Sequence, residues 1–442
     1  MLSLWKSLRV SSSLKADRYF HLGDLNQTSR DKLLPTTSTR LRSMPLETPL
    51  VTPSSQAPSA IALQEAVRRG RDHLLGSLPP VRSAPTPAPL PSCLSALHVE
   101  ELEYFAEDPE NPASLPSQCW VPLRLVKKQQ SSLSNRLPVV IFIHCTGSDK
   151  NSQALRQAQY AERGYLTAAI DTRYHGARVD PNLPYQQAIV QSWLKATATM
   201  SVAANGGSVG GNGDNKKPNK NSIERPFLLD VIWDLQRLLD YLASRDDVDP
   251  QRFGATGESL GGMVTWLLAA ADDRVAAVAP MCGVQNFRYA VENDCFHARV
   301  RSIPHVFTQA AKDLRGAEGA GQVDRDVVAA VWEKIMPSLL SDSPENGYDA
   351  PISLGLIAPR PCLVLTGEID EKAPLKGVEI VMENARKAYK KALMESAGVG
   401  SEEETEARLR LFVEAGVGHE FTPTMHREVE EFMDKWLLLN KE

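Results

Sequence analysis

The chain is predicted to have an α/β fold, in which a mostly parallel, twisted sheet carries helices on both faces. Short apolar runs of strand length alternate along the chain with segments whose apolar residues recur at helical spacing. Such alternation requires a parallel sheet, because the connecting helices must bury their apolar faces on it. A serine, an acidic segment and a histidine also follow three of the predicted strands, at the edge of the sheet where ligands bind.

The predicted sheet begins with an edge strand at 97–105 and its hairpin partner at 120–126. The mostly parallel strands follow in chain order at 139–143, 166–170, 253–256, 275–280, 362–366 and 409–413. Between them, residues 227–242 are predicted to form a helix, because their apolar side chains recur every three or four positions.

Residues 1–94 are predicted to be an N-terminal tail. The segments 44–58 and 79–91 are rich in proline and are predicted to be extended linkers. Apolar spacing between residues 61 and 75 predicts one amphipathic helix that lies against the body or the cap.

The core that carries the sheet is predicted in two parts, at 95–282 and 351–442. Residues 283–350 separate two core strands and hold helical runs, so they are predicted to form a helical cap over the site. Residues 203–221 are rich in glycine, asparagine and lysine and are predicted to be a disordered loop.

The first sixteen residues contain no acidic side chain and five serines, together with Lys6, Arg9 and Lys15. This composition is typical of an organelle presequence, and an ordinary disordered tail explains it equally well. The apolar stretch is too broken for a secretory signal. The expected location is therefore intracellular, in the cytoplasm or in an organelle (plastid or mitochondrion).

Composition excludes several kinds of protein. The chain has 49 Lys and Arg against 54 Asp and Glu, and no basic stretch dominates, which argues against nucleic acid as the main partner. No apolar run approaches the ~18 to 20 residues that a transmembrane segment needs. The six cysteines form no Cys-x-x-Cys pair, and no His pair has ligand spacing, so reduced thiols, no metal and no cofactor are predicted. Oligomeric state is left open.

Ser259 is the predicted nucleophile. It lies in Gly-Glu-Ser-Leu-Gly at 257–261, with a strand-like run before it and helical apolar spacing after it. A strand that turns sharply into a helix presents the serine oxygen at the tip of a strained bend, and the flanking glycines avoid clashes there. A second Gly-x-Ser-x-Gly, around Ser208, lies in a low-complexity stretch and is predicted to be incidental.

A nucleophilic serine needs a base and an acid that orients the base. His419 is the predicted base, because it ends a Gly-x-Gly-His turn after the apolar run 409–413. Three acidic residues, Glu368, Asp370 and Glu371, follow the run at 361–366. Asp370 is the preferred acid because it lies three residues past the glycine that ends the strand.

The oxyanion hole must offer N–H donors to the developing negative oxygen. The predicted donors are the backbone N–H of Leu260, directly after the nucleophile, and that of Thr146, in the loop after 139–143. His144 is expected to brace this loop, and Cys145 is expected to be incidental.

Two further groups of residues have competing interpretations. Phe287 and Trp332, in the predicted cap, are candidates for the substrate pocket, and ordinary helical packing is the alternative. Asp171, Arg173 and His175 could suggest a metal or second acid site, but charges after a strand more often brace their own loop.

On these residues the chain resembles α/β-hydrolases of the branch shared by prolyl-oligopeptidase-type and dienelactone-hydrolase-like domains, and more closely little-characterised plant α/β-hydrolases. The segments 171–178, 257–263 and 357–361 and the acid and histidine turns carry the resemblance, which covers about residues 95–440. It implies an α/β-hydrolase fold with Ser259 as nucleophile, Asp370 as acid and His419 as base. Dienelactone hydrolases proper have a cysteine where this chain has Ser259, so a lactone substrate is not implied.

The predicted function is a carboxylesterase-like serine hydrolase that cleaves carboxylic esters of a small or medium substrate through an acyl-enzyme on Ser259. A serine peptidase of the prolyl-oligopeptidase type is one alternative, although the residues before the core are expected to be too few for the propeller that gates such peptidases. A non-catalytic ligand receptor on the same fold is the other. The acyl and alcohol groups stay open, because pocket shape determines them.

Overall fold

The computed structural model describes residues 58–68, 71–85, 89–107, 116–129, 136–204, 227–336, 338–341, 343, 347–398 and 400–438. The predicted presequence, the second serine motif around Ser208, and all but the first two residues of the predicted loop at 203–221 lie outside them. Those three predictions therefore stay predictions.

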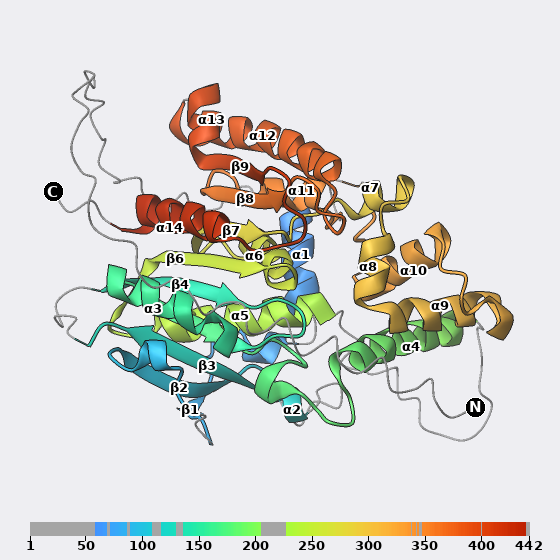
Figure 1. Ribbon diagram of the computed structural model, residues 1–442, viewed down its shortest axis with the longest axis horizontal. Coiled ribbons are helices and arrows are strands. Elements are labelled where there is room, and N and C mark those ends of the chain that lie inside the picture. Colours follow the sequence, from blue (N-terminus) through green and yellow to red (C-terminus); the bar gives the residue numbers. More distant parts are fainter. Residues whose placement is uncertain are drawn as a thin grey trace, which may run out of the picture. The chain divides into compact units, whose positions relative to one another are not determined.

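The described residues form one nine-stranded sheet with the order β1-β2-β3-β5-β4-β6-β7-β8-β9 (Figure 1). Strands β1 to β3 pair antiparallel, β3 is antiparallel to β5, and all further pairs are parallel. The sheet is therefore mostly parallel, as predicted, and has the strand order of the α/β-hydrolase fold. The strands are β1 (Val81–Ser83), β2 (His98–Phe105), β3 (Trp120–Lys127), β4 (Leu137–Ile143), β5 (Leu166–Ile170), β6 (Val248–Glu258), β7 (Val275–Met281), β8 (Cys362–Gly367) and β9 (Leu409–Glu414).

The strand predicted at the edge of the sheet is not at the edge. Strand β2 matches the run predicted at 97–105, but β1 pairs along its outer side, with Val81 opposite Tyr104. Strand β1 comes from the proline-rich segment that was expected to be only a linker. A segment of this kind can pair there because an edge strand needs hydrogen bonds on one side only.

Helices cover both faces of the sheet. Helices α3 and α14 lie on one face, where Phe432 and Met433 pack against strand residues such as Val140. Helices α1, α5, α6 and α12 lie on the other face, which holds the larger apolar core. The α-helices are α1 (Pro58–Arg68), α2 (Pro116–Cys119), α3 (Ala154–Arg163), α4 (Tyr185–Ala204), α5 (Phe227–Ala243), α6 (Leu260–Ala271), α7 (Phe287–Glu292), α8 (His297–Ser302), α9 (Pro304–Arg315), α10 (Arg325–Ile335), α11 (Ala350–Ser353), α12 (Leu375–Ala397), α13 (Glu402–Arg408) and α14 (Pro423–Leu437). None of the described helices is both long and apolar enough to cross a bilayer.

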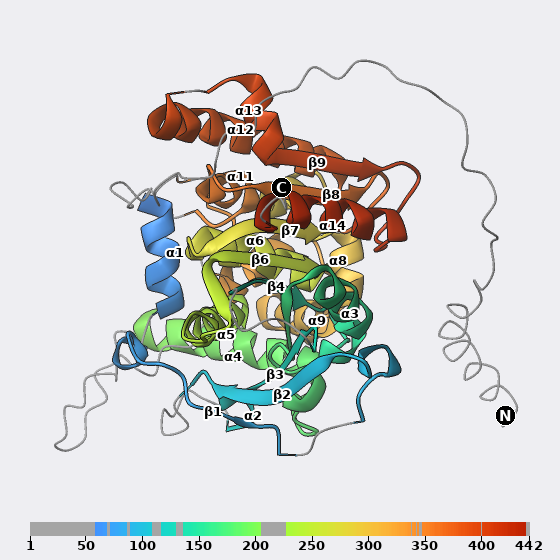
Figure 2. The same cartoon turned by 90° about the vertical axis from the view of Figure 1, so that its left-hand side faces the viewer.

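Helix α1 joins the main core, but it ends at Arg68, and residues 72–74 form a separate 3-10 turn, so the single helix expected between 61 and 75 is wrong in its second half. Its Leu63 and Val67 are fully buried. Figure 2 shows it reaching from α5 towards α11. Just beyond it, the buried Arg71 guanidinium pairs with Glu107, which follows β2, and with Asp230 in α5, so charge also holds this segment in place.

A helical layer formed by α4, α8, α9 and α10 lies beyond the carboxyl ends of the parallel strands (Figure 1). Helices α8 to α10 come from the insertion expected at 283–350, whereas α4 comes from the connection between β5 and β6. The indole Nε1 of Trp193 in α4 donates to Asp313 Oδ2 in α9 at 2.8 Å. Two separate segments of the chain therefore build this layer.

Candidate active site

Ser259 lies between β6 and α6, at the bend that its sequence predicts. Its backbone has φ 54° and ψ −109°, a conformation that L-residues rarely adopt. The flanking glycines are required by space: a Cβ on Gly257 would lie 2.6 Å from the Gly261 carbonyl carbon, and one on Gly261 would lie 2.1 Å from the Ile143 oxygen. The bend therefore packs directly against β4 and holds the serine at the end of the sheet.

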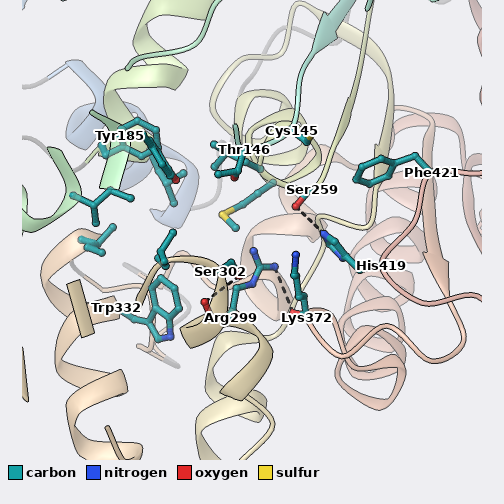
Figure 3. Close-up of a pocket in the computed structure, with 17 residues that line it drawn as sticks. Cys145, Thr146, Tyr185, Ser259, Arg299, Ser302, Trp332, Lys372, His419 and Phe421 are labelled. Atoms are coloured by element: carbon teal, nitrogen blue, oxygen red, sulfur yellow. Dashed lines mark hydrogen bonds between the residues drawn. The ribbon is translucent and has the colours of Figure 1, made fainter. Parts of the chain in front are cut away.

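The structure brings Ser259, His419 and Asp370 together. His419 Nε2 lies 2.8 Å from Ser259 Oγ, and His419 Nδ1 lies 2.8 Å from Asp370 Oδ2. An ionised carboxylate only accepts hydrogen bonds, so Nδ1–H donates to Asp370 and Nε2 is left to accept from the serine hydroxyl. Figure 3 shows His419 turned towards Ser259 at the cavity.

Asp370 is held as an anion. Burial raises its pKa, but the hydrogen bond and the charge of His419 and two backbone N–H groups outweigh burial, so the pKa lies below its ordinary value. Those N–H groups are of Lys372 and Ala373, at 2.8 and 3.1 Å from Oδ1. Of its acidic neighbours, Glu368 accepts instead from the Gly416 N–H at 2.8 Å, and the exposed Glu371 pairs with Arg301.

The two predicted oxyanion donors border the same cavity as Ser259. Leu260 is the first residue of α6, so its N–H has no acceptor within that helix. Thr146 precedes Gly147, whose φ of 77° turns the loop after β4. Burial raises the pKa of Tyr185, which borders the same cavity, to about 12.

His144 braces this loop, as predicted. Its Nδ1–H donates to the Cys145 carbonyl at 2.8 Å, and its Nε2 accepts from the Thr172 N–H at 3.0 Å. Burial lowers the pKa of His144, so the neutral ring that both contacts require is favoured. Cys145 borders the cavity, but burial raises the pKa of its thiol, which leaves it a poor nucleophile beside Ser259.

The loop after β5 is also braced by its own charges. Asp171 accepts from the backbone N–H groups of Lys150 and Ala177, at 2.8 and 2.9 Å. The buried Arg173 guanidinium contacts Asp234 Oδ1 at 2.8 Å, and it also pairs with Glu107 and Asp230. For Asp171 and Arg173 these contacts agree with the expected role of bracing the loop.

Cys282 was not predicted to lie near the site. Its Sγ, a carboxylate oxygen of Asp370 and a ring nitrogen of His419 lie within 4.8 Å of one another, a set that could ligate a metal. Burial and the charge of Asp370 raise the pKa of Cys282 to about 12, whereas a metal ligand must be a thiolate. The thiol instead donates to the Glu420 carbonyl at 3.4 Å, next to His419. This donor set suits a support for the histidine loop better than a metal site.

A cavity of about 220 Å³ opens beside Ser259. The helical layer supplies much of its wall, and His419, Phe421 and Lys372 border it on the other side (Figure 3). Its apolar lining comes from α4, α5, α6, α10 and the end of α8, and consists of Ile189, Phe227, Leu228, Leu260, Met263, Ile303, Trp332 and Ile335.

The two aromatic residues proposed for the pocket differ in position. Trp332 borders the cavity, whereas Phe287 is absent from the described lining and packs behind Trp332, with ring centroids 5.1 Å apart. Packing, the alternative interpretation, therefore describes Phe287. Sequence reasoning missed Tyr185, Arg299 and Lys372 as lining residues. Of these three, only Lys372 could have been found from the sequence, because it lies two residues after the predicted acid Asp370.

Comparisons with known proteins find similarity to hydrolases. A model of the dienelactone hydrolase family matches residues 124–317. Among curated proteins, "Putative hydrolase YtaP" of Bacillus subtilis (strain 168) is 26% identical over 234 residues, which are 51% of this chain and 62% of that protein. The match thus spans less than two thirds of the relative.

Among solved structures, acetyl xylan esterase 1 from Thermoanaerobacterium sp. JW/SL YS485 is 15% identical, with a TM-score of 0.48 over 85% of this chain and 93% of the other. An acetyl xylan esterase from Paenibacillus sp. R4 is also 15% identical, with a TM-score of 0.49 over 89% of this chain and 100% of the other. The resemblance to dienelactone-hydrolase-like domains is confirmed by the family match. The closer resemblance to plant hydrolases stays a prediction.

Proposed function

We propose that this chain, which carries a dienelactone hydrolase family domain on an α/β-hydrolase fold, is a serine hydrolase that cleaves carboxylic esters through an acyl-enzyme on Ser259. The observation that carries the proposal is the continuous hydrogen-bond chain from Asp370 through His419 to Ser259, which ends at a cavity. A serine hydroxyl alone is a weak nucleophile, and this chain supplies the base that it needs.

In the first half-reaction, Ser259 Oγ attacks the ester carbonyl carbon while His419 Nε2 takes the hydroxyl proton. The carbonyl oxygen becomes an oxyanion, which the N–H groups of Leu260 and Thr146 stabilise. His419 then gives its proton to the departing alkoxide as the ester C–O bond breaks. Asp370 stays ionised throughout and stabilises the imidazolium.

In the second half-reaction, water replaces the alcohol. His419 removes a proton from the water as its oxygen attacks the acyl carbon, and the same proton returns to Ser259 Oγ when the acyl bond breaks. A carboxylic acid leaves, and the resting hydrogen bonds re-form.

The cavity favours a compact ester over a peptide. Peptidases add binding sites that hold a chain in register, because an amide has a poor leaving group. Here the space beside Ser259 is about 220 Å³ and the helical layer borders it, which suits a small or medium substrate. The receptor alternative is disfavoured by the intact hydrogen bonds, since binding alone needs no base aligned with the serine.

A fluorophosphonate probe tests the nucleophile. We expect a single labelled serine, Ser259, identified by mass spectrometry, and no labelling in Ser259→Ala. Ser302→Ala is the matched control, because Ser302 borders the same cavity but its hydroxyl donates to the Ala298 carbonyl at 3.0 Å. Labelling that persists in Ser259→Ala would show that Ser259 is not the nucleophile and would contradict the proposal.

Turnover of p-nitrophenyl esters and aminoacyl anilides then separates the function classes. We expect butyrate-sized or aromatic esters to be cleaved far faster than the anilides. Comparable rates would favour the peptidase. Tight ligand binding without turnover of either class would favour the receptor.

A further inference from the structure

Two positive side chains border the cavity beside Ser259. Arg299 comes from α8 and Lys372 from the loop after β8, and Figure 3 shows both below the serine. Arg299 Nε donates to Gln285 Oε1 at 2.9 Å, and its Nη2 donates to the Lys372 carbonyl at 3.4 Å. These partners are neutral, and neither cation forms an ion pair with any of the described residues.

No side chain in the described part of the cavity lining supplies a matching negative charge. None of the described lining residues is acidic. The carboxylate whose charge acts on both cations is Asp370, and it is already bound by His419 and two backbone N–H groups. One carboxylate beside two cations leaves one positive charge in excess.

Burial disfavours the charged form of both side chains. Burial lowers the pKa of Arg299 to about 10, although Asp370 acts in the opposite direction. Burial, and after it the charge of Arg299, lowers the pKa of Lys372. An anion bound in the cavity beside both groups would favour their charged forms, because opposite charges attract strongly in a site with little water.

On the basis of the proposed function, we infer that the ester cleaved at Ser259 carries a carboxylate, which Arg299 and Lys372 bind. The planar guanidinium of an arginine matches a carboxylate in shape and donates hydrogen bonds to it. The rest of the substrate is apolar, because the remaining wall includes Phe227, Trp332 and Ile335. The substrate class is therefore a compact, apolar ester with one negative charge.

Matched acid and amide pairs test this inference in the full chain. The first pair, 4-carboxyphenyl butyrate and 4-carbamoylphenyl butyrate, places the charge on the alcohol part. The second, monophenyl adipate and phenyl adipamate, places it on the acyl part. We expect kcat/KM to favour the acid by about tenfold or more in one pair, as is typical of hydrogen bonds to charged groups. That pair then identifies which part of the substrate carries the carboxylate.

Substitutions assign the preference to the cavity. In Arg299→Gln and in Lys372→Gln we expect the acid-to-amide ratio to fall towards one. Because both rates come from the same variant, a loss of folded protein cancels. Arg301→Gln is the control, since Arg301 lies in the same helix but is exposed and pairs with Glu371 at 2.6 Å, and it should keep the ratio.

Three outcomes would overturn the inference. Equal rates for acid and amide in both pairs would show that the cavity does not select an anion. An equal fall in Arg301→Gln would assign the effect to overall charge. If no ester is cleaved and Ser259 is not labelled, the proposed function fails and this inference fails with it, a result distinct from equal cleavage of the members of each pair.

Discussion

Glu258 comes immediately before Ser259 in the chain, and its carboxylate lies 3.6 Å from the imidazole Nε2 of His426. This contact is not an ion pair at neutral pH. Burial, and after it the charge of Arg156, lowers the pKa of His426 to about 3. Burial also raises the pKa of Glu258. The first turn of α14 therefore packs against the elbow with a neutral histidine.

His426 is predicted to make stability depend on pH. Its pKa is about 3 in the folded protein and about 6.5 when unfolded, so the unfolded chain binds the proton more readily. The stabilising contribution is complete above about pH 6.5 and is lost progressively as the pH falls towards 3. Between pH 7 and 5 the loss should be about 1–2 kcal/mol. Measured by urea unfolding, His426→Gln should lose less unfolding free energy between pH 7 and 5 than the unaltered chain does. His98→Gln, which changes an exposed histidine, should lose as much as the unaltered chain.

The choice of acid is tested by comparing neighbouring carboxyls. Asp370→Asn removes the acceptor that orients His419, so kcat should fall by about 10³-fold, and His419→Ala should cost as much or more. Glu371→Gln should leave kcat unchanged, because Glu371 is exposed and contacts Arg301. Ester turnover under saturating substrate measures all three. A severe loss of kcat in Glu371→Gln together with a mild loss in Asp370→Asn would show that Asp370 is not the acid that orients His419.

Trp332 and Phe287 are predicted to differ in their effect on specificity. Trp332→Ala enlarges the cavity directly and should shift the preferred acyl group to a longer one. Phe287→Ala removes a side chain behind it and should chiefly destabilise the protein, by about 3–5 kcal/mol. A series of p-nitrophenyl esters of increasing chain length measures the first effect, and denaturant unfolding the second. An unchanged chain-length profile in Trp332→Ala would mean that this wall does not contact the acyl group.

The buried charges around Arg173 are predicted to be essential for stability. Arg173→Gln leaves Glu107 and Asp234 buried with fewer positive partners, which should cost about 3–5 kcal/mol. Arg163→Gln, which breaks a partly exposed pair with Asp434, should cost about 0–1 kcal/mol. Urea unfolding compares the two. Similar costs would show that burial does not strengthen the inner cluster.

Strands and reactive residues were predictable because their signals are local. An apolar run followed by a glycine turn fixes both the strand and the side chain that it presents, which is why Ser259, Asp370 and His419 could be named and are found together. The cavity wall depends on contacts between segments far apart in the chain. Nothing near Arg299 or Tyr185 in the sequence indicates that both border the cavity. Helical spacing likewise could not tell which of Phe287 and Trp332 faces the cavity. Strand β1 was not predicted because it is only three residues long and lies in a proline-rich segment.

The reactive atoms and the cavity wall belong to different parts of the architecture. Ser259, Asp370 and His419 follow the carboxyl ends of β6, β8 and β9, and around Ser259 the glycines Gly257 and Gly261 leave no room for even a methyl group. The wall comes largely from α4, α8 and α10, which enter through two independent connections of the sheet. Substitutions that reshape the helices can therefore accumulate while the bond-breaking geometry stays the same. In such a molecule the choice of substrate can change while the rate of bond cleavage is kept. A new substrate then requires changes in the helices of the wall and none in the sheet.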